Sequence, residues 1–272
     1  MGMTALRAPG PTSKSGVMLG AIVGDVVGSV HELARTKSDT FKLLVPESTF
    51  TDDTVLTVAT AHAILDGTAY DVQYRAFGRR YPDAGYGGLF LKWLANDAAG
   101  PYGSWGNGSA MRVSPVGFAF DSVEDVLREA ERSARATHDH PEGIKGAQAV
   151  ALAVFMARSG SSKAHVRDVL TQRFGYELTR TIEEIRPTYV WDVSCRQSVP
   201  EAIIAFLDSS SVEDAIRKAV SLGGDAYTQA AIAGAIGEAF YGADNLPRVD
   251  EIRRRVPVEL LDVVDRFRAV YC

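Results

Sequence analysis

Four glycines recur at every fourth position near the start of the chain, at residues 16, 20, 24 and 28. If this segment is helical, the spacing places them on one face, and a neighbouring backbone can pack closely against that smooth stripe. The same spacing marks helix dimers in membranes, but Asp25 interrupts the apolar run, which falls short of the ~20 residues that span a bilayer. We therefore expect a helix over residues 17–34 that packs tightly inside a helical core.

The rest of the chain has helical periodicity, and no segment of useful length alternates between apolar and polar residues. No low-complexity linker, internal repeat or break in composition divides the chain. We expect an all-α fold, a single compact orthogonal bundle of about a dozen helices over residues 16–272, after a disordered tail at residues 1–15. Further helices are expected over residues 51–65, 71–80, 89–94, 122–137, 141–157, 161–173, 179–185, 199–207, 212–222, 225–241 and 257–270, while only residues 186–195 have a β-like composition.

Composition and charge narrow the class of protein. The chain is 46% hydrophobic and 23% charged, which is typical of soluble globular proteins. A net charge of −5 provides no basic surface for nucleic acid. Its two cysteines, Cys195 and Cys272, fit a reducing compartment, and the first residues lack the apolar core of a secretory signal. We expect a cytoplasmic protein with no membrane segment.

A cluster of acids and hydroxyls stands at the start of the second expected helix, Thr51-Asp52-Asp53-Thr54. Such residues are good helix N-caps, because they accept free backbone N–H groups and offset the helix dipole. Capping is the simpler interpretation. Two carboxylates are nevertheless more than a cap needs, and hard cations prefer oxygen ligands of this kind, so a metal site stays open.

Two glycine-rich loops could bind phosphate through their backbone N–H groups, although an ordinary loop is the default interpretation. The first contains Gly85 and Gly87, and the second runs from Pro101 to Gly108 with Tyr102 and Trp105. A third polar cluster, Gly223 to Thr228, lies at the mouth of a helix of small residues, where it suggests a site rather than packing alone.

Two histidines, His138 and His140, lie within three residues before Pro141, which suits the first turn of the next helix. They could be ligands, contacts to a base or helix caps. A pair of this kind most often has a structural role.

Taken together and in order, these segments resemble the ADP-ribosylglycohydrolase family. Each motif alone is weak, but their shared order over residues 20–242 makes the resemblance specific. The matching segments are Gly20 to Ser29 with Glu32, Thr51 to Thr54, Gly85 to Gly88, Gly106 to Arg112, Thr137-His138 ahead of Pro141, and Gly223 to Thr228.

The resemblance implies an all-α fold with two Mg²⁺ ions at the floor of a cleft. Mg²⁺ takes carboxylate, hydroxyl and water oxygens, and a pair of ions can grip ribose hydroxyls and position a water. The implied metal ligands are Thr51, Asp52, Asp53, Asp225 and Thr228. The implied substrate contacts are Gly85, Gly87, Asn107, Gly108, Ser109, Met111 and His138, with Tyr102 or Trp105 able to stack on adenine.

The implied catalytic residues are Asp52, Asp53 and Glu32. Glu32 matches a family glutamate near the scissile bond that is implicated in gating or in the chemistry. Its simpler interpretation is a solvated acid at a helix end.

The chain departs from the family pattern at Tyr227, where relatives have an aspartate that helps to hold the metals. A phenol has a pKa near ~10 and is neutral at pH 7, so the site loses one negative charge and gains a ring. We expect one metal ion to be strongly weakened and the other to persist. Three accounts stay open: a hydrolase with an altered site, a protein that binds ADP-ribose without efficient turnover, or an introduced substitution.

The sequence therefore predicts a Mg²⁺-dependent hydrolase that releases ADP-ribose from a modified protein side chain or small acceptor. The alternative is an ADP-ribose-binding protein whose catalysis is impaired by Tyr227. A helical protein that uses the Asp-Asp motif on another phosphate or sugar substrate is a third, weaker hypothesis.

Overall fold

The computed structural model describes residues 18–271, in which helices and their connections account for the whole fold. Over these residues no β-strand forms, and an isolated antiparallel bridge joins Gly106 to Ser194. The expected all-α class is confirmed, while the expected tail lies outside the described part of the chain. The helices are α1 (Leu19–Gly28), α2 (Asp52–Asp66), α3 (Tyr70–Arg80), α4 (Gly88–Leu94), α5 (Gly108–Met111), α6 (Ser114–Ala119), α7 (Val123–Arg135), α8 (Pro141–Arg158), α9 (Lys163–Phe174), α10 (Ile182–Ile185), α11 (Cys195–Leu207), α12 (Val212–Val220), α13 (Ala226–Tyr241), α14 (Val249–Arg253) and α15 (Val258–Tyr271), with a 3-10 turn at Ala243–Asn245.

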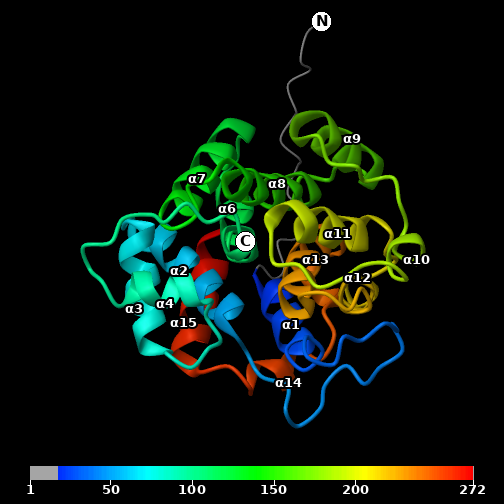
Figure 1. Cartoon of the computed structure of the whole chain (residues 1–272), viewed down its shortest axis with the longest axis horizontal. Coiled ribbons are helices and arrows are strands. Elements are labelled where there is room, and N and C mark those ends of the chain that lie inside the picture. Colours follow the sequence, from blue (N-terminus) through cyan, green and yellow to red (C-terminus); the bar gives the residue numbers. More distant parts are fainter. Residues whose placement is uncertain (1–17, 272) are drawn as a thin grey trace, which may run out of the picture.

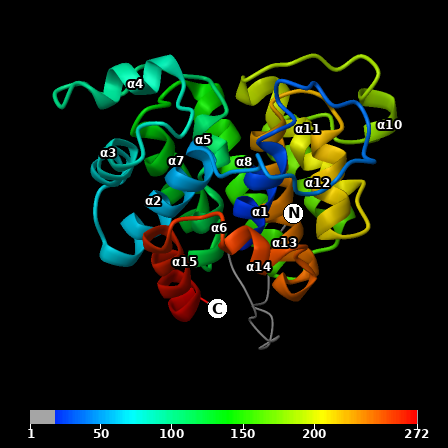
Figure 2. The same ribbon diagram turned by 90° about the horizontal axis from the view of Figure 1, so that it is seen from below.

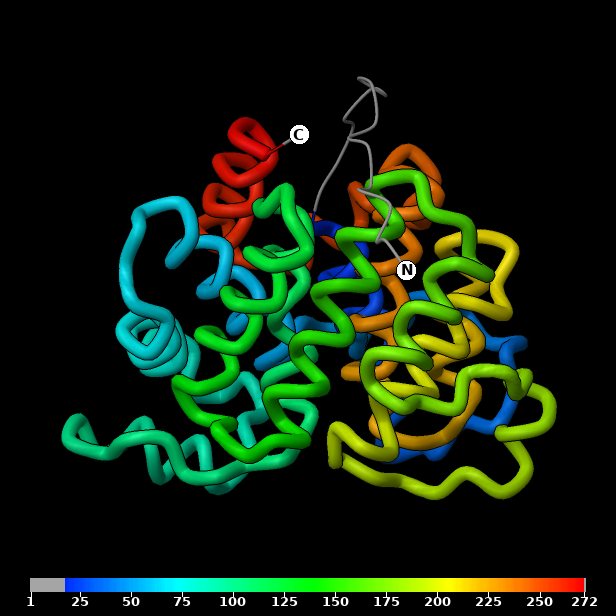
Figure 3. The backbone as a smooth tube through the Cα atoms, turned by 90° about the horizontal axis from the view of Figure 1, so that it is seen from above, coloured from blue at the N-terminus to red at the C-terminus, as the bar shows by residue number. Residues whose placement is uncertain are grey.

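Three helices, α1, α8 and α13, lie in the middle of the bundle (Figure 1). Helices α2, α3, α4 and α15 flank them on one side, and α10, α11 and α12 flank them on the other (Figure 2). The backbone tube in Figure 3 shows the same two sides of the bundle, with α15 and α3 on one side and α12 on the other. Among residues 18–271, none of the helices has the length and apolarity that crossing a bilayer requires.

The glycine stripe of α1 packs directly against the backbone of α13, as its spacing predicts. A Cβ atom at Gly24 would lie 2.1 Å from the carbonyl oxygen of Ala230, and one at Gly28 would lie 2.4 Å from the Cα of Tyr227. Any larger side chain would force the two helices apart. The first glycine of the series, Gly16, lies outside the described residues. The stripe therefore fixes the distance between α1 and the start of α13.

Helix α1 ends at Gly28, so the expectation that it continues to residue 34 is wrong. The hydroxyl of Ser29 donates to the carbonyl of Val26 at 2.9 Å and accepts from the backbone N–H of Thr49 at 3.1 Å. Such a side-chain bond offers the backbone an alternative to helix continuation. As a result Glu32 lies on a turn, and not at a helix end.

Several other boundaries differ from those expected. Helix α10 forms only over Ile182–Ile185, where Thr181 and Glu184 build a capping box, and α11 begins four residues earlier than expected, at Cys195. Helices α5, α6 and α14 were not expected, because each is at most six residues long and too short to display a helical period. Most of the longer helices lie within two residues of their predicted ends.

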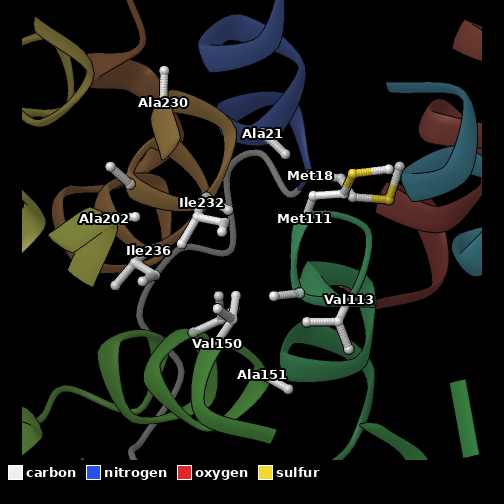
Figure 4. Close-up of a cluster of buried hydrophobic side chains, with 14 of the residues drawn as sticks. Met18, Ala21, Met111, Val113, Val150, Ala151, Ala202, Ala230, Ile232 and Ile236 are labelled. Atoms are coloured by element: carbon white, nitrogen blue, oxygen red, sulfur yellow. The ribbon is translucent and has the colours of Figure 1, made fainter. Parts of the chain in front are cut away.

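Apolar side chains from distant parts of the chain fill the centre of the bundle. Figure 4 shows Ala21 of α1, Met111 of α5, Val150 of α8, and Ile232 and Ile236 of α13 in one buried cluster. Burying such side chains contributes roughly 25 cal/mol per Å² of apolar surface. This core holds the ends of α1, α2, α5 and α13 together, and these ends carry the polar motifs.

Candidate functional site

A pocket of about 390 Å³ lies where these helix ends meet. Most of the predicted site residues line it. They are Glu32, Asp52, Asp53, Gly85, Gly87, Asn107, Gly108, Met111, His138, Asp225 and Thr228, joined by Tyr102, Arg112, Trp191, Val193 and Tyr227. Two predicted residues, Thr51 and Ser109, do not line this pocket.

Three buried carboxylates meet at the pocket from two helix starts. Asp52 and Asp53 are in the first turn of α2, and Asp225 is the residue before α13. Asp53 Oδ1 accepts from the hydroxyl of Thr228 at 3.4 Å. Asp225 Oδ2 accepts from the side-chain amide of Asn107 at 2.8 Å, which links the acids to the second glycine-rich loop.

A fourth buried acid, Asp25 of α1, holds the start of α2 in place. Its carboxylate accepts from the backbone N–H and the hydroxyl of Thr51, at 2.8 and 2.6 Å, and from both corresponding groups of Thr54. Burial raises the pKa of Asp25, and these four hydrogen bonds oppose that rise. Asp25 was part of the motif match, but its function as an anchor could not be predicted from sequence.

Thr51 is the N-cap of α2, and its hydroxyl accepts from the backbone N–H of Asp53 at 3.3 Å. The backbone N–H of Asp52 donates to the carbonyl of Ala84 at 2.7 Å, next to Gly85 in the first glycine-rich loop. Gly85 has a φ of +99°, a conformation that favours glycine. The two predicted motifs are therefore packed together as one unit.

Burial and mutual repulsion make the carboxylates of the pocket unusually basic. Burial raises the pKa values of Asp52 and Asp53 well above the ordinary range, and neighbouring carboxylates raise them further. Burial also raises the pKa of Asp225 to about 6, against the hydrogen bond from Asn107. A cation at this place would relieve the repulsion.

The pocket offers carboxylate oxygens of the kind that a hard cation prefers. One carboxylate oxygen each of Asp52, Asp53 and Asp225 is buried without a hydrogen-bond partner, which is costly unless another group binds it. Within residues 18–271, no three or more Asp, Glu, His or Cys side chains are grouped so that they could hold a metal ion by themselves. A cation here would complete its shell with hydroxyl, water or ligand oxygens.

Tyr227 lies in the same pocket, half-buried, one helical position before Thr228. Burial raises the pKa of its phenol, and the charges of Asp225, Asp52 and Asp53 raise it further. The phenol is therefore neutral, and it can donate or accept a hydrogen bond or serve as a weak oxygen ligand. The position supplies no negative charge to the pocket.

His138 forms another part of the pocket wall. Its Nδ1 lies 2.7 Å from the hydroxyl of Thr137, which also accepts from the guanidinium of Arg112 at 2.7 Å. Burial lowers the pKa of His138 well below the usual range, and the charge of Arg112 lowers it further, so the imidazole is neutral. A Cβ at Gly108 would lie 3.0 Å from His138 Nε2, so the loop glycine makes room for the ring.

Of the two histidines before Pro141, His140 is a helix cap and does not line the pocket. Its Nδ1 accepts from the backbone N–H of Glu142 at 3.1 Å at the start of α8. Of the two aromatic residues, Tyr102 lines the pocket with its ring 5.8 Å from that of His138, whereas Trp105 is exposed and does not line it. Ser109 is buried and donates to the carbonyl of Gly143 at 2.7 Å.

Trp191 and Val193 line the pocket but were not predicted as site residues. Both belong to residues 186–195, whose β-like composition in a helical chain was the only available signal. The indole N–H of Trp191 donates to Glu32 Oε1 at 3.2 Å. This contact joins the turn after α1 to the segment before α11.

Known proteins resemble this chain over almost its whole length. Residues 14–271 match the sequence pattern of the ADP-ribosylglycohydrolase family. The chain is 31% identical to ADP-ribosylhydrolase ARH3 of Homo sapiens over 85% of this chain and 86% of the human protein. It is 26% identical to the ADP-ribosylarginine hydrolase Tri1 of Serratia proteamaculans, over 86% of this chain and 72% of that protein.

The fold is also similar to that of a solved ADP-ribosylglycohydrolase-related protein complex, with a TM-score of 0.67 and 24% identity over 94% of this chain and 98% of the other. That likeness bears on the fold alone. The match to the family pattern extends from before α1 to the end of α15, and it includes every motif that meets at the pocket. The chain therefore belongs to the ADP-ribosylglycohydrolase family.

Proposed function

We propose that this chain hydrolyses the glycosidic bond between ADP-ribose and the protein side chain or small molecule that carries it. Family membership supports the proposal, as do relatives named ADP-ribosylhydrolase and ADP-ribosylarginine hydrolase. The observation that carries it is the meeting of Asp52, Asp53 and Asp225 in one pocket with two glycine-rich loops.

In this proposal Asp52 or Asp53 orients the attacking water and accepts one of its protons. Burial and the neighbouring carboxylates raise the pKa values of both groups, and a carboxylate with a raised pKa is a stronger base than an exposed one. The water oxygen bonds to the anomeric carbon of the ribose, and the bond from that carbon to the acceptor breaks. The acceptor leaves with a proton, which balances the proton that the carboxylate has taken from the water. We assign the side of the departing acceptor to Glu32, which lines the pocket and lies on the turn that is hydrogen-bonded to Trp191.

The remaining pocket residues hold ADP-ribose. The backbone N–H groups around Gly85 and Gly108 are suited to the diphosphate, since such loops bind anions without a charged side chain. The neutral imidazole of His138 offers Nε2 to a polar atom of the ligand, and Tyr102 offers an aromatic face for the base.

We propose Mg²⁺ as the cofactor, with Asp52, Asp53, Asp225 and Thr228 as the residues that hold it. When bound, the ion supplies Lewis-acid polarisation of the water and neutralises charge near the ribose hydroxyls. Support comes from the three unpartnered carboxylate oxygens. Because Tyr227 adds no charge, we propose one tightly held ion in place of the two that the family resemblance implies. Thr51 contributes by fixing the turn through Asp25.

Tyr227 also supports a second candidate, an ADP-ribose-binding protein with impaired turnover. The grip on ADP-ribose depends on the loops and on His138, which this substitution leaves intact. The chemistry depends on the negative charge of the pocket, to which the neutral phenol of Tyr227 contributes nothing.

Release of ADP-ribose from peptides carrying ADP-ribosyl-arginine or ADP-ribosyl-serine tests the proposal. With Mg²⁺ we expect turnover of at least one peptide, which EDTA abolishes and Asp52→Asn lowers by about 10²-fold. Asp262→Asn, at an exposed position on α15 whose side chain makes no hydrogen bond, serves as the matched control.

Absence of release from both peptides by the folded protein would exclude the hydrolase for these acceptors. Calorimetry with ADP-ribose then separates the two candidates. Micromolar binding without turnover, together with turnover in Tyr227→Asp, supports the binding protein.

A further inference from the structure

The ammonium group of Lys37 connects parts of the chain that surround the pocket. Its Nζ donates to the carbonyl oxygens of Arg186 at 2.9 Å, Tyr189 at 2.6 Å and Leu222 at 2.5 Å. A lysine ammonium has three donors, so all three are used. A single side chain therefore ties the turn after α1 to the segment after α10 and to the end of α12.

The glycine pair Gly223-Gly224 makes room for this connection. A Cβ at Gly223 would lie 2.9 Å from Lys37 Cε, and one at Gly224 would lie 2.5 Å from the ring of Tyr189. Both glycines immediately precede the pocket acid Asp225. The absence of side chains at Gly223 and Gly224 therefore leaves space for Lys37 and Tyr189 beside the start of α13.

A second set of contacts lies between the same two segments, closer to the pocket. Trp191 Nε1 donates to Glu32 Oε1 at 3.2 Å, and the guanidinium of Arg35 lies 5.1 Å from the centre of the Trp191 ring. Glu32 and Trp191 both line the pocket. The hydrogen bond restricts the directions in which this carboxylate can point.

We propose that Trp191 is a positioning residue for Glu32, and that Lys37 holds the segment of Trp191 in place. The inference rests on the proposed function, in which Glu32 stands beside the departing acceptor. The hydrogen bond from the Trp191 indole N–H orients the carboxylate of Glu32 toward the pocket. The hydrogen bonds of Lys37 hold residues 186–191 next to the turn that carries Glu32. We name these two residues and their contacts the Lys37–Trp191 clamp.

Hydrogen–deuterium exchange of the full chain tests the clamp without any need for turnover. In Lys37→Met, which keeps the stem but removes the donors, we expect exchange over residues 29–37 and 186–193 to rise by about fivefold or more. Lys42→Met is the matched control, because Lys42 is an exposed lysine of the same connection without hydrogen bonds. Unchanged exchange in Lys37→Met, or an equal rise in Lys42→Met, overturns the role of Lys37.

A double-mutant cycle on turnover tests whether Trp191 acts through Glu32. Trp191→Phe keeps an aromatic ring for Arg35 and removes the N–H, so we expect kcat to fall by about tenfold with KM changed by less than about threefold. In a Glu32→Ala background, which offers no acceptor to the indole N–H, the same substitution should lower kcat by less than about twofold, since coupled residues are not additive. Fully multiplicative effects, or an unchanged kcat in Trp191→Phe, overturn the proposal.

The two measurements separate failure of the clamp from failure of the proposed function. If the wild-type chain has no turnover, the hydrolase assignment fails, and hydrogen–deuterium exchange alone then tests whether the Lys37–Trp191 clamp exists. Trp191→Phe must then raise exchange over residues 29–35 relative to wild type by about fivefold. An equal rate in the two proteins overturns the contact between Trp191 and Glu32.

Discussion

The carboxylate of Asp25 binds Thr51 twice, through its backbone N–H at 2.8 Å and through its hydroxyl at 2.6 Å. Thr51 is the N-cap of α2, so a residue inside α1 sets where α2 begins. Because Asp52 and Asp53 follow immediately, the position of both pocket acids depends on this contact. The anchor itself does not line the pocket.

Replacing Asp25 by asparagine should therefore affect both stability and binding. The amide keeps one acceptor oxygen but turns an N–H₂ group toward donors of Thr51 or Thr54, so we expect a loss of about 3 kcal/mol in the free energy of unfolding. We also expect calorimetry to show at least about tenfold weaker ADP-ribose binding. Asp262→Asn should leave both quantities unchanged, and wild-type stability in Asp25→Asn would refute the anchor.

Tyr227 should set the affinity of the pocket for divalent cations. Tyr227→Asp adds a carboxylate beside Asp52, Asp53 and Asp225, and we expect it to tighten Mg²⁺ or Mn²⁺ binding by about tenfold or more. Tyr227→Phe keeps the ring and should change the affinity by less than about threefold, because the side chain is uncharged in both proteins. Titration calorimetry measures both, and equal affinities in Tyr227→Asp and wild type would contradict this account.

The glycine stripe should be intolerant of even a single methyl group. In Gly24→Ala the new Cβ would lie 2.1 Å from the carbonyl oxygen of Ala230, so α1 and α13 must separate. We expect a loss of about 3 kcal/mol in chemical denaturation. Gly100→Ala has nothing within 4 Å of the new atom and is the matched control. Equal stability of the two variants would show that α1 can shift without cost.

Glu238 should make stability depend on pH. Its buried carboxylate accepts from the backbone N–H of Gly20 at 2.7 Å, and burial raises its pKa from 4.5 to about 7. Between these values the folded state binds more protons than the unfolded state, so the free energy of unfolding falls as pH rises through 7. The contribution amounts to about 3 kcal/mol, present below pH 4.5 and lost above pH 7.

Glu238→Gln removes this titration, so urea denaturation at pH 5 and pH 8 should show a smaller difference in stability than in wild type. Glu47→Gln, at an exposed position without hydrogen bonds, should keep the full difference. An identical pH dependence in Glu238→Gln and wild type would assign the effect to the other buried acids.

The sequence by itself determined the helical class and the glycine stripe. Both depend on local information, because helical periodicity and a spacing of four between glycines act within one helix. The residue types of Asp52 and Asp53 left helix capping and metal binding open, and it was the resemblance of their motifs to a family that singled out these two acids and Asp225. The ends of α1 and α10 were missed, because side-chain bonds such as that of Ser29 compete with helix continuation.

The tertiary structure alone decided which side chains act together. Asp25 reaches Thr51 across 26 positions, Trp191 reaches Glu32 across 159, and Lys37 reaches Leu222 across 185. Local propensity carries no information about such pairs, since each joins segments that only the tertiary packing brings together. The packing of α1 against α13 also places Tyr227 among the pocket acids, where its neutral phenol adds no negative charge.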